Sequence, residues 1–275
     1  MNARPRFSPF LPVLLAVFVL ALGCEPSREK SPAPAVSVAL PPLETHADSV
    51  AMRVYDAMGG PEAWAQLRYL GFEFTFQPEG GQRRPGRKHF WDRKTGAYRL
   101  RWTRGADTTY TVLFNVNTKA GTAFRNGAPV DSTENEELLA SAYRSFINDT
   151  YWLLMPVKML DPGVNRAYEA DSSDAATEVI RLTFGEVGLT PKDRYWVYVD
   201  RASWLVRHWA YVLQGRRGQP PTHWDWTGYE TFETPAGPLR LATRKVGSAG
   251  AILTDRIVMP LRAPEGLFTD PAHDF

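Results

Sequence analysis

The stretch that decides the fold is RYWVYVDRASWLVRHWAYVL, residues 194–213. Aromatic and β-branched residues stand on both sides of a short polar break at residues 200–203, which is typical of an antiparallel β-hairpin. Tyr195 alternates with Trp196 along the first strand, so large side chains point to both faces. Such a strand is covered on both faces, or it lines a cavity on one of them. The hairpin therefore predicts either the centre of a buried sheet or a ligand-lined face.

Segments with the same alternating pattern lie on both sides of this hairpin. They are residues 69–77, 88–92, 97–103, 109–116, 121–125, 178–184, 223–232, 238–246 and 252–259. Turn residues such as Asn126-Gly127 separate them. No regular alternation of strands with helices is present. The pattern predicts an antiparallel meander of roughly ten strands.

Three segments have helical spacing instead. Residues 45–58 end at Gly59-Gly60, and Pro61 opens a short helix over residues 62–67. Residues 134–155 form a longer helix with acids in its first turn, and Pro156 is predicted to end or kink it. From Ile147 onward this helix is apolar nearly all round. We therefore expect its second half to be buried or to cover something apolar.

The first 23 residues have the pattern of a secretory signal peptide. Arg4 and Arg6 precede an apolar run that ends at Gly23-Cys24. The run is too short for a stable transmembrane helix. Residues 20–24, LALGC, resemble a bacterial lipobox, which implies that Cys24 is acylated and becomes the new amino terminus. Residues 24–42 are then a lipidated cysteine and a proline-rich tether, and residues 43–275 form one domain.

The charge balance gives no indication of a nucleic-acid partner. The chain has 32 basic and 30 acidic residues, and the basic count falls to 30 once the two leader arginines are removed. The single cysteine excludes an internal disulfide. The mature chain is therefore expected to be close to neutral and to contact the membrane through the acylated Cys24.

The sequence has few of the residue patterns used in catalysis. It contains no G-x-S-x-G, phosphate-binding loop, dinucleotide-binding glycine pattern or H-E-x-x-H. His223 and Asp225, with Glu230 further on, are the nearest approach to a metal or hydrolase site, and two well-placed groups rarely make one. His208 is interpreted as a packed strand histidine. We predict no enzyme activity, no catalytic residue, no metal and no cofactor.

Nine tryptophans distinguish the composition. They indicate either a core built from large aromatic side chains or a wide apolar pocket between a curved sheet and the helix at residues 134–155. The second interpretation predicts a cavity lined by Phe74, Trp102, Ile147, Tyr151, Trp152, Leu154 and Trp196.

Three motifs carry a resemblance to a known family. They are the helix-to-strand junction AMGGPEAWAQLRYLGFEFTF (residues 57–76), the hairpin with Asp200 leading its turn, and Gly237-Pro238-Leu239-Arg240 before a basic strand. Together they resemble the LolA/LolB-like lipoprotein-carrier superfamily over most of residues 45–259. The resemblance implies a mainly β (α+β) fold, an open antiparallel half-barrel with helices capping its concave face, which binds acyl chains. The family's lipid-contacting arginine could correspond to Arg68, Arg99 or Arg101.

The sequence thus predicts a monomeric, lipid-anchored protein of the bacterial cell envelope, with the outer membrane favoured over the inner. Its expected partners are lipid or lipoprotein acyl chains, such as palmitate, bound in the half-barrel. One alternative is an anchored interaction module whose cavity is filled by its own side chains. Another is an envelope hydrolase that uses His223, Asp225 or Glu230.

Overall fold

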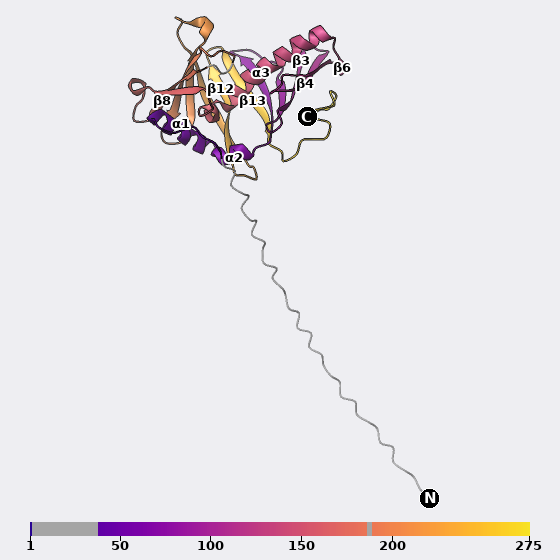
Figure 1. The fold of residues 1–275 in the computed structure, drawn as a ribbon, viewed down its shortest axis with the longest axis horizontal. Coiled ribbons are helices and arrows are strands. Elements are labelled where there is room, and N and C mark those ends of the chain that lie inside the picture. The colour runs from indigo at the N-terminus through magenta and orange to yellow at the C-terminus, as the bar shows by residue number, and fades with distance from the viewer. Residues whose placement is uncertain (2–37, 186–188) are drawn as a thin grey trace. The chain divides into compact units, whose positions relative to one another are not determined.

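The computed structural model describes Met1 and residues 38–185 and 189–275 (Figure 1). The chain divides into two units, residues 1–34 and 35–275, and every helix and strand below belongs to the second. The signal peptide predicted for residues 1–23, apart from Met1, lies outside the described residues. So do Cys24 and most of the predicted tether. The helices within the described ranges are too short or too polar for any of them to cross a membrane.

One antiparallel sheet of thirteen strands forms the domain. Its strands are β1 (Tyr69–Pro78), β2 (Arg87–Asp92), β3 (Ala97–Arg104), β4 (Thr108–Asn115), β5 (Gly121–Arg125), β6 (Ala128–Pro129), β7 (Val164–Tyr168), β8 (Thr177–Phe184), β9 (Arg194–Asp200), β10 (Val206–Val212), β11 (Thr222–Phe232), β12 (Leu239–Gly247) and β13 (Gly250–Val258). The predicted count of roughly ten is too low. The pattern missed β6 and β7, because β6 has two residues and β7 (VNRAY) lacks alternating apolar positions.

The order of the strands explains how the sheet is assembled. It runs β6-β5-β4-β3-β2-β1-β13-β12-β11-β10-β9-β8-β7, so two meanders meet where the first strand pairs with the last. The two edges, β6 and β7, are consecutive in the chain and are not paired with each other. The sheet is therefore open, as predicted.

Helix α3 (Ser132–Lys158) connects those two edges across the sheet (Figure 1). Its 27 residues correspond to about 40 Å at 1.5 Å per residue. Asp131 caps its first turn by accepting a hydrogen bond from the Glu134 N–H at 2.9 Å. The sequence predicted that Pro156 ends or kinks the helix. The helix does not end there, because it continues to Lys158. So close to the end of the helix, the proline removes only the bond to the Trp152 carbonyl.

Two shorter helices cover the rest of the same face. Helix α1 (His46–Ala57) begins with a capping box between Thr45 and Asp48, and α2 (Pro61–Gln66) begins after Gly60. Gly59 between them has φ +117°, and a Cβ there would lie 2.5 Å from the Pro238 carbonyl oxygen. This position therefore requires glycine.

The hydrophobic core lies between the helices and the sheet in two parts. The larger part joins α1, α2 and the second half of α3 to β1 and β8–β13, and includes Trp209 and Trp226. The smaller part joins the first half of α3 to β3–β5. Residues Trp152, Leu153, Leu154 and Met155 of α3 are all buried, which confirms the expected burial of its second half.

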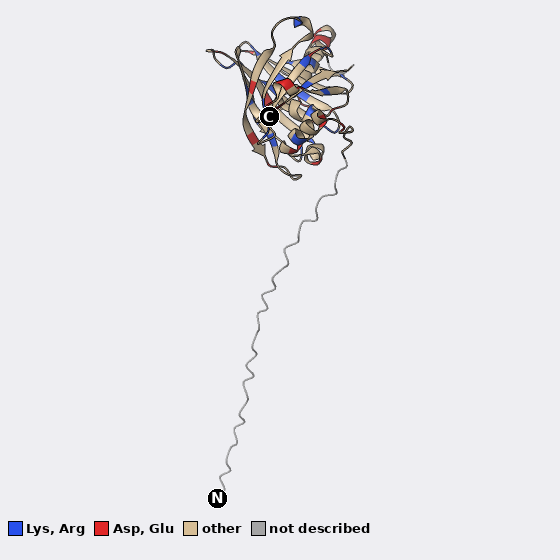
Figure 2. Ribbon diagram, turned by 90° about the vertical axis from the view of Figure 1, so that its left-hand side faces the viewer, with Lys and Arg blue, Asp and Glu red and all other residues tan. Residues whose placement is uncertain are grey.

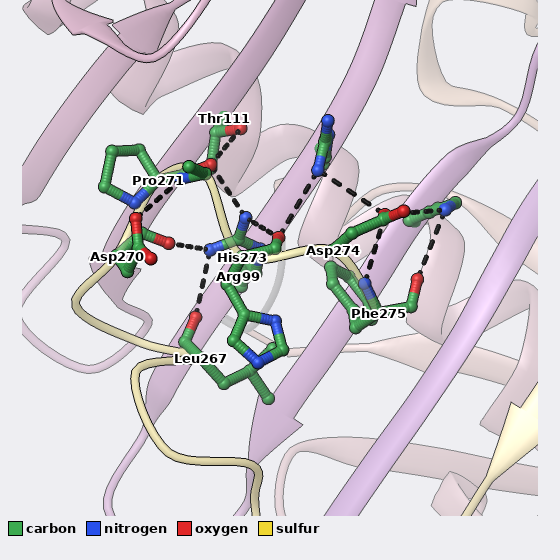
Figure 3. A network of polar contacts seen from close by, with 11 residues as sticks. Arg99, Thr111, Leu267, Asp270, Pro271, His273, Asp274 and Phe275 are labelled. Carbon is green, nitrogen blue, oxygen red and sulfur yellow. Dashed lines mark hydrogen bonds and ion pairs between the residues drawn. The ribbon is translucent and has the colours of Figure 1, made fainter.

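The C-terminal segment covers part of the opposite face of the sheet (Figure 3). Arg99 of β3 is fully buried there, and its two terminal nitrogens donate hydrogen bonds to the carbonyls of Leu267, Asp270, Pro271 and His273 at 2.5–3.1 Å. Elsewhere, basic and acidic residues are interspersed along the strands and helices (Figure 2).

Candidate functional site

A cavity of about 390 Å³ lies between α3 and strands β8–β10. We call it the α3 cavity. It is lined by Arg144, Ile147, Asn148, Tyr151 and Trp152 of α3, by Phe184, Tyr195, Trp209, Tyr211 and Leu213 of the sheet side, and by the loop residues Leu189, Thr190 and Asp193. Its volume lies in the range of about 300–1,000 Å³ that small-molecule sites occupy.

Six of its thirteen lining residues are aromatic. Trp209 is the centre of this group, with ring centroids 4.6 Å from Trp152, 5.2 Å from Tyr195 and 6.1 Å from Tyr151. The rings meet edge to face or tilted, which are the favourable arrangements for aromatic pairs. This part of the wall is therefore preformed and mainly apolar.

A β-bulge places Trp209 in this wall. Val206 pairs with Val199, and Trp209 pairs with Val197, with a register shift between Val206 and His208. Val206 and Trp209 consequently face the same core, although strict alternation would put them on opposite faces.

The polar groups of the cavity divide into a buried carboxylate and an exposed cation. Asp193 is buried and accepts hydrogen bonds from the Thr190 hydroxyl (2.6 Å), the Tyr195 hydroxyl (3.2 Å) and the Gln214 N–H (2.7 Å). Burial, together with the charge of Asp193, raises the pKa of Tyr195, so this phenol remains a donor. Arg144 and Asn148 are exposed on α3 at the rim.

The predicted cavity residues are distributed over several places. Ile147, Tyr151 and Trp152 line the α3 cavity, and Leu154 is buried in the larger core. Phe74 is buried in that core with the Arg87 guanidinium 5.0 Å above its ring. Trp102 stacks on Tyr110 at 5.2 Å beside the smaller core, and Trp196 alternates with Tyr195 and does not line the cavity.

Comparison with solved structures finds chains of modest similarity over most of this chain. Among solved structures, similar chains are a DUF1329 family protein from Desulfovibrio piger (13% identity), a putative outer membrane lipoprotein-sorting protein domain from Vibrio parahaemolyticus (7%) and a LolA superfamily protein from Nitrosomonas europaea (9%). Each has a TM-score of 0.43, and the matches cover 80%, 80% and 82% of this chain and 94%, 95% and 99% of theirs. At these identities the likeness concerns the fold alone. Neither a family model nor a curated protein sequence matches the chain.

A buried polar network fixes α3 to the sheet beside the cavity. Asp149 is fully buried and accepts two hydrogen bonds from Arg87 of β2, at 2.6 and 2.8 Å. His89 Nε2 lies 3.0 Å from the same carboxylate, and His89 Nδ1 lies 2.7 Å from the Tyr98 hydroxyl. Burial would raise the pKa of Asp149, but the hydrogen bonds from His89 and Arg87 outweigh it and lower the pKa. Burial lowers the pKa of His89, which favours its neutral form.

This Tyr98–His89–Asp149 group has the residue types of a proton relay, but its location does not suit catalysis. All three side chains have at most 1% of their surface exposed. A catalytic base must come within hydrogen-bond reach of its substrate. We therefore assign the group a structural role, holding α3 in place.

Another polar group, with two histidines, lies on the outer side of β10 and β11. His208 Nδ1 is 2.7 Å from Asp225 and His208 Nε2 is 3.0 Å from His223. Glu230 is exposed further along β11 and forms no ion pair with another described residue. None of these residues lines the α3 cavity. In the part of the chain that the structure describes, no group of three His, Cys, Asp or Glu residues is arranged so that it could hold a metal ion.

The three arginines considered from the resemblance also lie away from the cavity. Arg68 pairs with Asp92 at 2.9 Å, Arg99 holds the C-terminal segment, and Arg101 lies 3.5 Å from Asp274. The arginine at the cavity is Arg144, which the sequence did not single out. Its signal in the sequence was a basic residue in the middle of the helix, with uncharged residues one turn away on either side.

Proposed function

We propose that this protein is a lipid-anchored protein of the bacterial cell envelope that binds an acyl chain, from a lipid or a lipoprotein, in the α3 cavity. The observation that carries the proposal is the preformed aromatic cavity under α3. A core filled by its own side chains would leave no such space. Acylation at Cys24 and residence at the outer membrane belong to the same proposal and rest on the sequence pattern of residues 1–24.

The expected affinity follows from the number of acyl-chain methylenes that binding in the cavity removes from water. Each buried methylene contributes about 0.8 kcal/mol, so a chain burying about ten of them gains about 8 kcal/mol before ordering costs. That corresponds to a dissociation constant of about 1 μM. The buried Asp193 adds little desolvation cost, because the donors around it already satisfy its oxygens, and Arg144 lies exposed at the rim.

The test is a titration of the purified protein with a fluorescent fatty acid, accompanied by thermal melts of the same samples. Ile147→Glu places a charge on a half-buried wall residue, and it should abolish binding with little change in melting temperature. Trp102→Ala is the matched control, since Trp102 lies at the smaller core. It should bind as the parent does.

Two results would contradict the proposal. One is a parent protein that shows no saturable binding well above micromolar ligand, which would favour the interaction module. The other is unchanged binding by Ile147→Glu, which would place the ligand elsewhere. Leu154→Arg is unsuitable for this test, because Leu154 is 4% exposed in the core and its substitution would unfold the protein.

A further inference from the structure

The rim of the α3 cavity carries the cation Arg144, which has no acidic partner among the described residues. Arg144 is exposed, and no carboxylate of the described residues lies within 4.0 Å of it. The positions one turn away on α3 are Ala140, Ser141, Ile147 and Asn148, and none is acidic. Arg87 and Arg166 have carboxylate partners at 2.6 Å, whereas exposed arginines such as Arg240 resemble Arg144 in having none among the described residues. What distinguishes Arg144 from Arg240 is its place at the cavity.

The interior of the cavity has the opposite charge. Among the described residues that line it, Asp193 is the only charged one besides Arg144, and it is buried. An anionic group that entered deeply would approach this carboxylate in a water-poor environment, where repulsion is strong. The same group at the rim would lie beside Arg144. A cationic head would be repelled at the rim.

The size of the cavity restricts the apolar part of a ligand. A volume of about 390 Å³ lies at the lower end of the range for small-molecule sites. The wall between Ile147 and Trp209 is aromatic and aliphatic, and offers no row of polar groups to a second head or a sugar.

We infer that the cavity selects single-chain amphiphiles with an anionic head, a carboxylate or a phosphate, that bind with the head at Arg144 and the chain against the aromatic wall. This inference rests on the proposed function and adds the class of ligand to it. The charge of the head contributes selectivity, while the chain provides most of the affinity.

The experiment compares ligands that share one chain and differ in the head. Each ligand is titrated against the full-length protein loaded with the neutral dye N-phenyl-1-naphthylamine, and displacement of the dye is measured. The ligands are palmitate, hexadecyl phosphate and the neutral hexadecanol. The parent, Arg144→Gln, Arg144→Lys and the control Arg240→Gln are tested at low and high salt. Arg240 is exposed on β12 and does not line the cavity.

We expect Arg144→Gln to weaken palmitate or hexadecyl phosphate about fivefold at low salt, the size of effect typical of an exposed ion pair. Hexadecanol and the dye should be unaffected, Arg144→Lys should retain most of the preference, and high salt should reduce it. The relative strengths of the two anionic ligands identify which head is preferred.

Equal binding of palmitate, hexadecyl phosphate and hexadecanol by the parent would overturn the inference and leave the proposed function intact. An equal loss for Arg240→Gln would also overturn it, since the effect would then come from net charge. Failure of the dye and of hexadecanol to bind at all would refute the proposed function itself.

Discussion

Lys245 of β12 is a fully buried amine with no acid beside it, and its removal should change how stability depends on pH. Its Nζ donates to the Ala242 carbonyl at 2.7 Å and lies 4.7 Å from the centre of the Trp226 ring. No carboxylate of the described residues lies within 4.0 Å. Burial lowers the pKa of Lys245 from 10.5 to about 7. The folded protein therefore holds this side chain neutral over a range in which the unfolded chain protonates it.

The sign of the effect follows from that difference. Between pH 7 and pH 10.5 the unfolded state binds one proton more than the folded state, so the free energy of unfolding rises with pH. Each pH unit contributes about 1.4 kcal/mol, so the whole interval from about 7 to 10.5 corresponds to about 5 kcal/mol. This stability is complete above pH 10.5 and is lost as the pH falls toward 7. In Lys245→Met the pH-dependent contribution of residue 245 is absent.

The assay is urea unfolding of the parent and Lys245→Met at several pH values between 7.5 and 9.5. Other titrating groups cancel in the difference between the two proteins. We expect the advantage of Lys245→Met to shrink by about 1.4 kcal/mol for each unit of rising pH. Lys158→Met serves as the control, because Lys158 lies at the surface beside Asp161. A difference that stays constant with pH would refute the reasoning, since Lys245 would then titrate alike in both states.

Three further predictions concern other parts of the chain. Asp149→Ala should lower the free energy of unfolding by about 3 kcal/mol, because Arg87 and His89 lose their buried partner. Asp161→Ala at the surface should change it by less than about 0.5 kcal/mol, and equal losses in urea melts would contradict the role of Asp149. Arg99→Met should expose residues 267–275 to limited proteolysis, because four carbonyl contacts are lost, whereas Arg101→Gln should leave the segment protected. Cys24→Ser should move the protein from the membrane fraction to the soluble fraction, because it removes the residue that is predicted to carry the acyl chains of the anchor. Unchanged membrane retention would argue against acylation.

Much of the fold could be predicted because most strands have one apolar face. The segment 121–125 matches β5 at both ends, and most other predicted strands agree with the structure within two residues. The exceptions have physical causes. β7 has polar residues at its centre and lies at an edge, and α3 continues through Pro156 because few hydrogen bonds remain beyond it. The strand order could not be predicted, because pairing between β1 and β13 depends on contacts far apart in the chain.

The site was less predictable than the fold. The apolar second half of α3 predicted the cavity residues Ile147, Tyr151 and Trp152. The alternating pattern of the hairpin did not predict which of its side chains line the cavity. β9 carries aromatic residues on both faces, so the sequence could not decide between Tyr195 and Trp196. The bulge before His208 then shifts Trp209 onto the cavity side. The polar residues Arg144 and Asp193 needed the three-dimensional arrangement to be recognised.

The pairing of β1 with β13 has a consequence for how the chain acquires its structure. Gly71 and Val258 are neighbours in the sheet, so the seam between the two meanders closes only when residues 69–78 find residues 250–258. Contacts between such distant segments form slowly, because the entropy of a long loop must be lost first. The chain emerging from the ribosome therefore lacks the strand that completes its sheet until residues 250–258 have been synthesised. A polypeptide that must be threaded through a membrane channel before it folds would benefit from this delay. We expect removal of residues 250–258 to leave an aggregation-prone chain, with β1 and β12 as unpaired edges.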